Sequence, residues 1–167
     1  NAELVQIWTD IDGMHNNDPR IVEHTRPIAE LSFDEASELA YFGAKILHPS
    51  SILPAKQFNI PVQLKNTMDP GAFGTMISSA EKSKEIKAIA AKDGITAIKV
   101  KSTRMLLAYG FLRNIFEIFE KYKTPIDMIA TSEVAVSLTI DDDARLPEIV
   151  EELNAFGAVT IDRDQSI

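Results

Sequence analysis

A polar loop directly follows the first apolar segment of the chain, residues 4–8, which we expect to form a short buried strand. Ligand residues of α/β sheets lie beyond the carboxyl ends of strands, so this loop is a candidate binding site. In a nucleotide site, Arg20 and Lys45 would contact phosphates, and Asp10 would fix the purine or the sugar. The polar residues that the loop offers are Thr9, Asp10, Asp12, Asp18 and Arg20.

The same loop has a plainer interpretation as a polar surface loop with Asx-type turns, and the sequence leaves both interpretations open. A calcium loop of the EF-hand type is excluded, because Gly13 comes too early and no glutamate occupies the closing position. The histidines are scattered without a ligand spacing, so we expect no metal site. The glycines at 71 and 74 lack a following Gly-Lys-Ser/Thr and make no phosphate loop.

The composition narrows the class of protein. The chain has 167 residues and a formal net charge of -8, with 45% apolar residues, which is ordinary for a globular protein. The acidic balance argues against nucleic acid as a partner. No apolar run approaches the roughly 20 residues of a membrane span, so no membrane partner is expected. Cysteine is absent, which excludes thiolate zinc sites and thiol nucleophiles and fits a cytoplasmic location.

The elements that must position the loop are predicted from local signals. Ser32 with Glu35 three residues later is a capping box, which predicts a helix from Phe33. Pro49 suits the first turn of a second helix over residues 48–58, with His48 at its start. Residues 61–65 are predicted to be a strand and 66–74 a loop. The small, polar and charged run 78–87 indicates a domain boundary.

Beyond that boundary the periodicities give a β-α-β-β-α-β order, the ferredoxin-like arrangement. Apolar residues alternate in strands and recur at helical spacing in between. We expect the phenylalanines at 111, 116 and 119, on the helix at 111–122, to be core residues. The expected elements are a strand at 96–101, a helix at 111–122, strands at 126–130 and 134–140, a helix at 146–153 and a strand around 159–161.

Several blocks of the chain resemble the aspartokinase family. The resemblance covers nearly the whole chain, and the run Tyr-Phe-Gly-Ala-Lys-x-Leu-His-Pro is highly specific. The residues at 110–112 and 127–134 resemble the first ACT regulatory domain of the lysine-sensitive monofunctional type. The blocks that resemble the kinase domain are residues 7–13, 18–20, 35–49, 60–62, 65–67 and 74–75.

The resemblance implies an α/β fold in which part of a three-layer amino-acid-kinase-type domain precedes a ferredoxin-like ACT domain. It assigns residues 1–80 to the carboxyl-terminal part of the ATP-binding kinase domain and 96–167 to the first ACT domain. Residues 81–95 become a linker and a strand that belongs to a second ACT domain. The family's Lys-Phe-Gly-Gly phosphate-binding run is not found in the chain. We therefore expect no catalytic residue here, and an inactive fragment of a larger enzyme.

The implied activity of the parent enzyme is the ATP-dependent phosphorylation of L-aspartate to 4-phospho-L-aspartate, the first step towards lysine, threonine and methionine. Mg2+ would arrive with ATP, bridging phosphate oxygens, and no tightly bound cofactor is expected. His15 stands where relatives often have a tyrosine that stacks on the nucleobase. Carried over position by position, the ATP contacts are Thr9, Asp10, His15, Arg20, Lys45 and Ile46.

The alternative function is an amino-acid-binding regulatory module without chemistry. In the resembled family the effector, L-lysine, lies between two paired ACT domains, so a homodimer is expected. A buried ammonium group needs a charged partner, which Asp127 can supply. The implied effector contacts are Met105, Ala108, Gly110, Phe111, Leu112, Asp127, Thr131 and Ser132.

The strand-like segment 86–92 is not needed for the β-α-β-β-α-β count. The resemblance gives it to a second ACT domain whose remaining elements lie further along the chain than residue 167. Unpaired backbone groups are costly in a folded protein. We therefore expect this segment to be disordered, repacked or paired with another copy of the chain.

Overall fold

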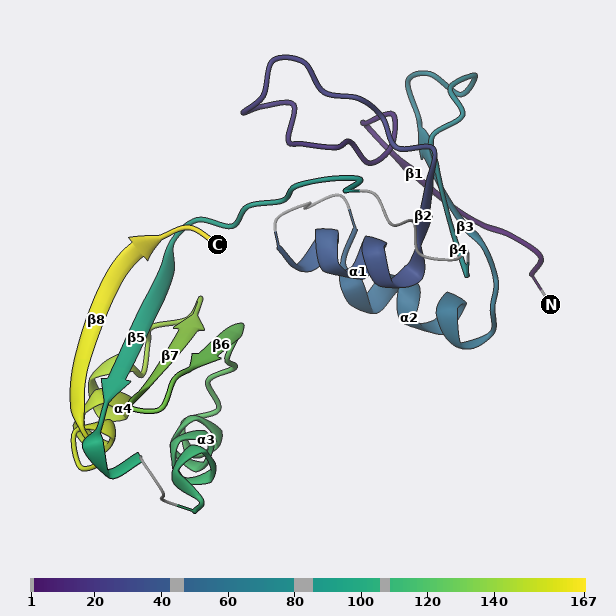
Figure 1. Ribbon diagram of the computed structural model, residues 1–167. Helices are drawn as coiled ribbons and strands as arrows, with labels where there is room; N and C mark the ends of the chain where they lie inside the picture. The colour runs from purple at the N-terminus through teal and green to yellow at the C-terminus, as the bar shows by residue number, and fades with distance from the viewer. Residues whose placement is uncertain (1, 43–46, 80–85, 106–108) are drawn as a thin grey trace. The chain divides into compact units, whose positions relative to one another are not determined.

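The computed structural model describes residues 2–42, 47–79, 86–105 and 109–167 (Figure 1). The chain divides into two compact units, Asn1–Ala91 and Lys92–Ile167. No helix in the described ranges is long and apolar enough to cross a membrane. The sequence-based division at residues 80 and 96 stays a prediction.

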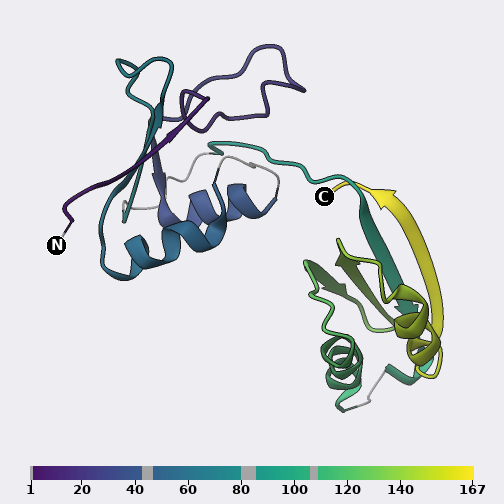
Figure 2. The same ribbon diagram turned by 180° about the vertical axis from the view of Figure 1, so that it is seen from behind.

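The first unit is a mixed four-stranded sheet with two helices on one side, as Figures 1 and 2 show. The strand order is β1-β3-β4-β2, in which β3 and β4 are antiparallel and the outer pairs are parallel. The sheet and its helices form two layers. The elements are β1 (Val5–Thr9), β2 (Glu30–Ser32), α1 (Phe33–Tyr41), α2 (Pro49–Gln57), β3 (Val62–Asn66) and β4 (Thr75–Ser78).

Both helices of the first unit begin where their capping residues predict. Ser32 accepts a hydrogen bond from the backbone N–H of Glu35, and the Glu35 carboxylate accepts one from the N–H of Ser32, so the capping box is complete. His48 caps α2, because its Nδ1 accepts from the N–H of Ser50 at 3.2 Å. The helices then pack against alternate strand residues such as Val62, Leu64 and Ile77.

The second unit has the β-α-β-β-α-β order predicted from the periodicities. Its sheet is antiparallel throughout in the order β6-β7-β5-β8, and α3 and α4 share one hydrophobic core with it. This confirms the ferredoxin-like arrangement. The elements are β5 (Ile95–Lys101), η1 (Thr103–Met105), α3 (Phe111–Lys121), β6 (Met128–Thr131), β7 (Ala135–Ile140), α4 (Leu146–Leu153) and β8 (Ala158–Gln165).

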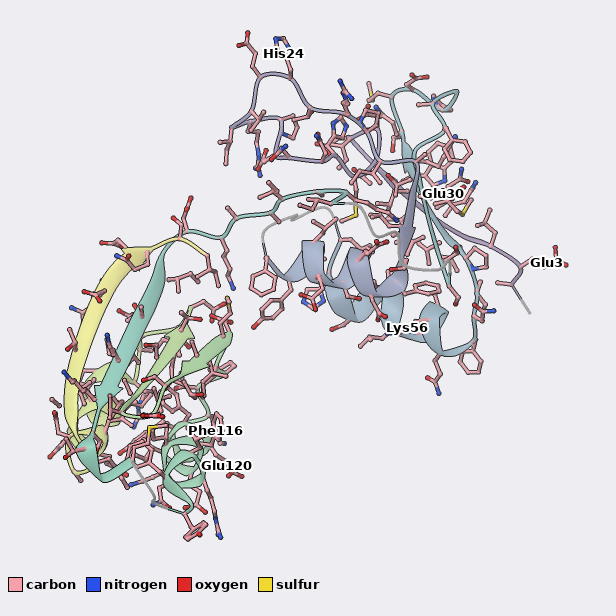
Figure 3. All side chains as sticks on the ribbon, in the orientation of Figure 1. Glu3, His24, Glu30, Lys56, Phe116 and Glu120 are labelled. Carbon is pink, nitrogen blue, oxygen red and sulfur yellow. The ribbon has the colours of Figure 1, made fainter. Side chains whose placement is uncertain are left out.

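The structure corrects two expectations about burial. The first strand is not fully buried: Leu4 is 40% and Trp8 45% exposed, and only Ile7 packs against the core. Among the described strands, β1 lies at the edge of its sheet and pairs with β3. Phe116 is 42% exposed on α3, so it is not a core residue (Figure 3). The apolar face of this helix is formed by Phe111, Ile115, Ile118 and Phe119.

Residues 86–92 do not form a regular strand, which corrects the strand-like interpretation. The Lys87 ammonium group pairs with the Glu35 carboxylate at 2.9 Å, and the Ile89 N–H donates to the carbonyl of Asn16 at 2.9 Å. Lys92 exchanges two backbone hydrogen bonds with Ile167. Hydrogen bonds within the chain therefore hold this segment at several points.

Candidate functional site

The candidate nucleotide site is the long loop between β1 and β2, residues 10–29, named here the β1–β2 loop (Figure 1). Its two arms are joined by backbone hydrogen bonds from Ile28 to Met14 and from Asn16 to Arg26. The Asn16 side chain also accepts from the Arg26 N–H at 2.7 Å. His24 lies at the far end of the loop (Figure 3). The loop is therefore an ordered hairpin-like excursion that begins at the carboxyl end of a strand.

Thr9 and Asp10 form the start of this loop. The Thr9 carbonyl accepts from the N–H of Thr67, which follows β3, at 2.7 Å. The Thr9 hydroxyl accepts from the N–H of Ile11 at 3.1 Å and lies 3.3 Å from the Asp10 carboxylate. Asp10 is exposed. Its carboxylate is accordingly accessible from solvent at the edge of the sheet where α/β proteins bind ligands.

The Arg20 guanidinium is held by the Asp18 carboxylate. The guanidinium makes hydrogen bonds of 2.6 and 3.0 Å to the two carboxylate oxygens, while the Arg20 side chain stays 72% exposed. The hydrogen bond from the Arg20 side chain is the main reason that the pKa of Asp18 falls to about 2. The Arg20 N–H also donates to Asp18, which is the Asx turn of the plainer interpretation. The exposed guanidinium is thus oriented before any anion arrives.

His15 is braced inside the loop. Its Nδ1 lies 2.8 Å from the Thr25 hydroxyl and its Nε2 2.7 Å from the Asp12 carboxylate. The side chain is only 15% exposed. Both ring nitrogens are therefore engaged in joining parts of the loop, and a small part of the ring is open to solvent. Lys45 and Ile46, the other expected ATP contacts, lie outside the described residues.

Thr75 is a contact of this loop that no sequence pattern indicated. It opens β4, and its hydroxyl accepts from the N–H of Met14 at 2.8 Å. The same hydroxyl donates to the carbonyl of Ile28 at 2.7 Å. The only sequence signal was the Gly-Thr pair at 74–75, which carries no information about what the threonine side chain binds.

The candidate effector residues fall at two ends of the second sheet. Gly110 is the N-cap of α3 with a φ of 81°, and Thr131 ends β6 in register with Val136, near the carboxyl end of β5. Asp127 precedes β6 at the other end, where its N–H donates to the carbonyl of Thr139 at 2.9 Å. One carboxylate oxygen of Asp127 is buried. A single copy therefore does not bring Asp127 together with Thr131.

The remaining effector candidates surround the start of α3 and the end of β6. Phe111 is buried, and Met105 and Leu112 pack against the same core. Ser132 is exposed, and its N–H donates to the carbonyl of Ala135 at 2.8 Å. Ala108 lies outside the described residues. Across the described ranges no three His, Asp or Glu side chains gather to hold a metal ion.

Comparisons with known proteins give consistent matches. The model of the amino acid kinase family matches residues 1–66. The chloroplastic aspartokinase 3 of Arabidopsis thaliana is 44% identical over 98% of this chain and 31% of its own length. The crystal structure of E. coli aspartokinase III with aspartate and ADP (R-state) matches with a TM-score of 0.88 and 36% identity, over 99% of this chain and 39% of that one.

The structure of the same E. coli enzyme with lysine and aspartate (T-state) has a TM-score of 0.83 and 37% identity, over 99% of this chain and 38% of that one. The chain spans about a third of the length of the curated relatives it matches. Both of its units lie within the matched length, since the matches cover nearly all of it.

Proposed function

The chain belongs to the aspartokinase family, and from this premise we propose that the whole protein transfers the γ-phosphoryl group of ATP to the side-chain carboxylate of L-aspartate. The products are 4-phospho-L-aspartate and ADP. The E. coli relative that holds aspartate and ADP supports this assignment. We further propose that the reaction opens lysine, threonine and methionine biosynthesis and takes place in the cytoplasm.

The observation that carries the nucleotide part is the geometry of Arg20. An exposed guanidinium, oriented by the Asp18 carboxylate at 2.6 Å, matches the oxygens of a phosphate group. In phosphoryl transfer the protein mainly positions groups and neutralises charge, which is the role assigned to Arg20 and to Lys45. Thr9, Asp10 and Ile46 complete the proposed ATP contacts. Mg2+ that arrives with ATP would supply further neutralisation.

His15 has a modified role in this proposal. Because both ring nitrogens hold the loop through Asp12 and Thr25, its contribution to nucleotide binding is to keep the loop in shape. Any contact with the base uses the small exposed part of the ring.

Isothermal titration of this chain with Mg–ATP tests the nucleotide site. We expect binding, and a Kd raised roughly tenfold by Arg20→Gln, because one charge-assisted phosphate contact is lost. The matched control is Arg26→Gln, which removes an exposed arginine from the same loop and leaves its backbone hydrogen bonds in place. Equal losses in the two variants would refute a specific role of Arg20. In the whole protein, trapping of aspartyl phosphate with hydroxylamine tests the reaction itself.

A second proposed function, feedback control, is assigned to the second unit. We propose that an amino acid, L-lysine, binds there between two copies of the chain. The exposed edge of β6 supports this, because antiparallel pairing with β6 of a second copy would bring Asp127 of one chain towards Thr131 and Ser132 of the other. The half-buried carboxylate of Asp127 would then face the ammonium group.

Titration with lysine, threonine and methionine tests the second unit separately. We expect lysine to bind, to favour a dimer by light scattering, and to lose its effect in Asp127→Asn. Glu133→Gln is the control, because it removes an exposed carboxylate close to β6. A monomer at about 100 µM with lysine present would overturn the assignment.

A further inference from the structure

We infer that Thr75 is a positioning residue for nucleotide binding. Its hydroxyl closes the base of the β1–β2 loop, where the two arms of the loop meet the sheet. The inference rests on the proposed function of that loop. Thr75 is fully buried, and its Oγ1 accepts from the N–H of Met14 at 2.8 Å and donates to the carbonyl of Ile28 at 2.7 Å. One hydroxyl thereby joins the arm that leaves the sheet to the arm that returns to it.

A backbone hydrogen bond beside this hydroxyl also joins the two arms of the loop. The Ile28 N–H donates to the carbonyl of Met14 at 2.7 Å, so the two arms are bonded directly as well as through Thr75. Met14 is 1% exposed and packs in the core of the first unit. Beyond Met14, every loop residue as far as Ile28 is at least partly exposed. Arg20 lies on the part of the loop that this base joins to the sheet, beyond the further hydrogen bonds between Asn16 and Arg26.

Gly13 is matched to this contact. Its φ is 127°, in a region that L side chains rarely adopt, and a Cβ built on it would lie 2.6 Å from the Thr75 hydroxyl oxygen. The close approach of the hydroxyl to the loop thus requires glycine at position 13. Gly13 and the hydroxyl of Thr75, which are far apart in the sequence, are thereby matched in space.

Removal of the hydroxyl would leave the Met14 N–H and the Ile28 carbonyl facing a methyl group. Buried polar groups without a partner are unfavourable, so the loop would open for part of the time. A ligand that binds only the closed loop then shows an apparent Kd equal to the intrinsic Kd divided by the fraction of molecules in which the loop stays closed. We therefore expect the affinity for ATP to fall and the rate of the chemical step to stay nearly unchanged.

The experiment compares Thr75→Val, which replaces the hydroxyl with a methyl group of similar size, with Thr75→Ser, which keeps it. In the whole enzyme we expect Thr75→Val to raise the KM for ATP about tenfold, with kcat and the KM for aspartate within about threefold of wild type. Thr75→Ser should restore the KM for ATP. An unchanged KM in Thr75→Val, or equal values in the two variants, would overturn the inference.

Two further measurements cover other outcomes. If Thr75→Val does not fold, Gly13→Ala must raise the KM for ATP in its place, and a wild-type KM there overturns the inference. Amide exchange in the nucleotide-free chain should be fast at Met14 in Thr75→Val and slow in wild type and Thr75→Ser. This exchange reports closure of the loop even if the wild-type protein binds no ATP, a result that would mean that the proposed function has failed. Slow exchange at Met14 in Thr75→Val would refute the role of Thr75 in closing the loop.

Discussion

Two phenylalanines on α3 allow a sharp test of the core of the second unit. Phe119 is 2% exposed and packs within the hydrophobic cluster, whereas Phe116 is 42% exposed on the same helix. Truncation of a buried phenylalanine to alanine costs about 3–5 kcal/mol, through lost burial and the cavity left behind. Phe116→Ala should cost less than about 1.5 kcal/mol, since much of its ring is already in water.

For a unit of this size, about 1 kcal/mol shifts Tm by roughly 4–8 °C, so Phe119→Ala should lower the Tm of the second unit by at least about 12 °C. Far-UV circular dichroism follows both units, and the fluorescence of Trp8, the single tryptophan of the chain, follows the first unit. We expect the circular dichroism transition to move and the Trp8 transition to stay. Equal effects of Phe119→Ala and Phe116→Ala, or an equal shift of the Trp8 signal, would refute the reasoning.

Three more predictions concern the first unit. Ser32→Ala removes the capping box of α1 and should lower the free energy of unfolding by about 1 kcal/mol in urea titrations followed by Trp8. The pKa of Asp18 is lowered from 3.8 to about 2, so its pairing with Arg20 favours the folded loop above pH 3.8 and is lost as the pH falls through 2. An NMR titration of the Asp18 carboxyl should show this midpoint, and Arg20→Gln should return it towards 3.8. Gly74→Ala should prevent normal folding, seen as lost circular dichroism, because its Cβ would stand 1.8 Å from the Leu64 carbonyl oxygen.

Local signals predicted the elements whose causes are local. The capping box at Ser32 fixed the start of α1, and the alternation from Ala135 to Ile140 marked β7, because a cap and a period depend on residues close in the sequence. The strands β2 and β4 were not predicted. They have three and four residues, and their stability comes from tertiary pairing, since β4 pairs with β3 and with β2, which lies far from it in the sequence.

Burial and side-chain partners were harder to predict. Leu4, Val5 and Trp8 are exposed and only Ile7 of this segment packs against the core, because composition does not tell whether another layer covers a strand. The Asx turn at Asp18 follows from its spacing to Arg20, whereas the contacts of Thr75 with Met14 and Ile28 depend on the tertiary fold. Sequence reasoning therefore located the candidate loop but not the residue that closes it.

The hydrogen bond from the Ile89 N–H to the carbonyl of Asn16 has a thermodynamic consequence. Ile89 precedes the second unit by a few residues, and Asn16 belongs to the β1–β2 loop. This hydrogen bond therefore contributes both to the stability of the ordered loop and to that of the ordered segment around Ile89. Linkage between two such sites is reciprocal. Any change that stabilises the ordered β1–β2 loop through this hydrogen bond must therefore stabilise residues 86–91 by the same free energy, and the reverse holds as well.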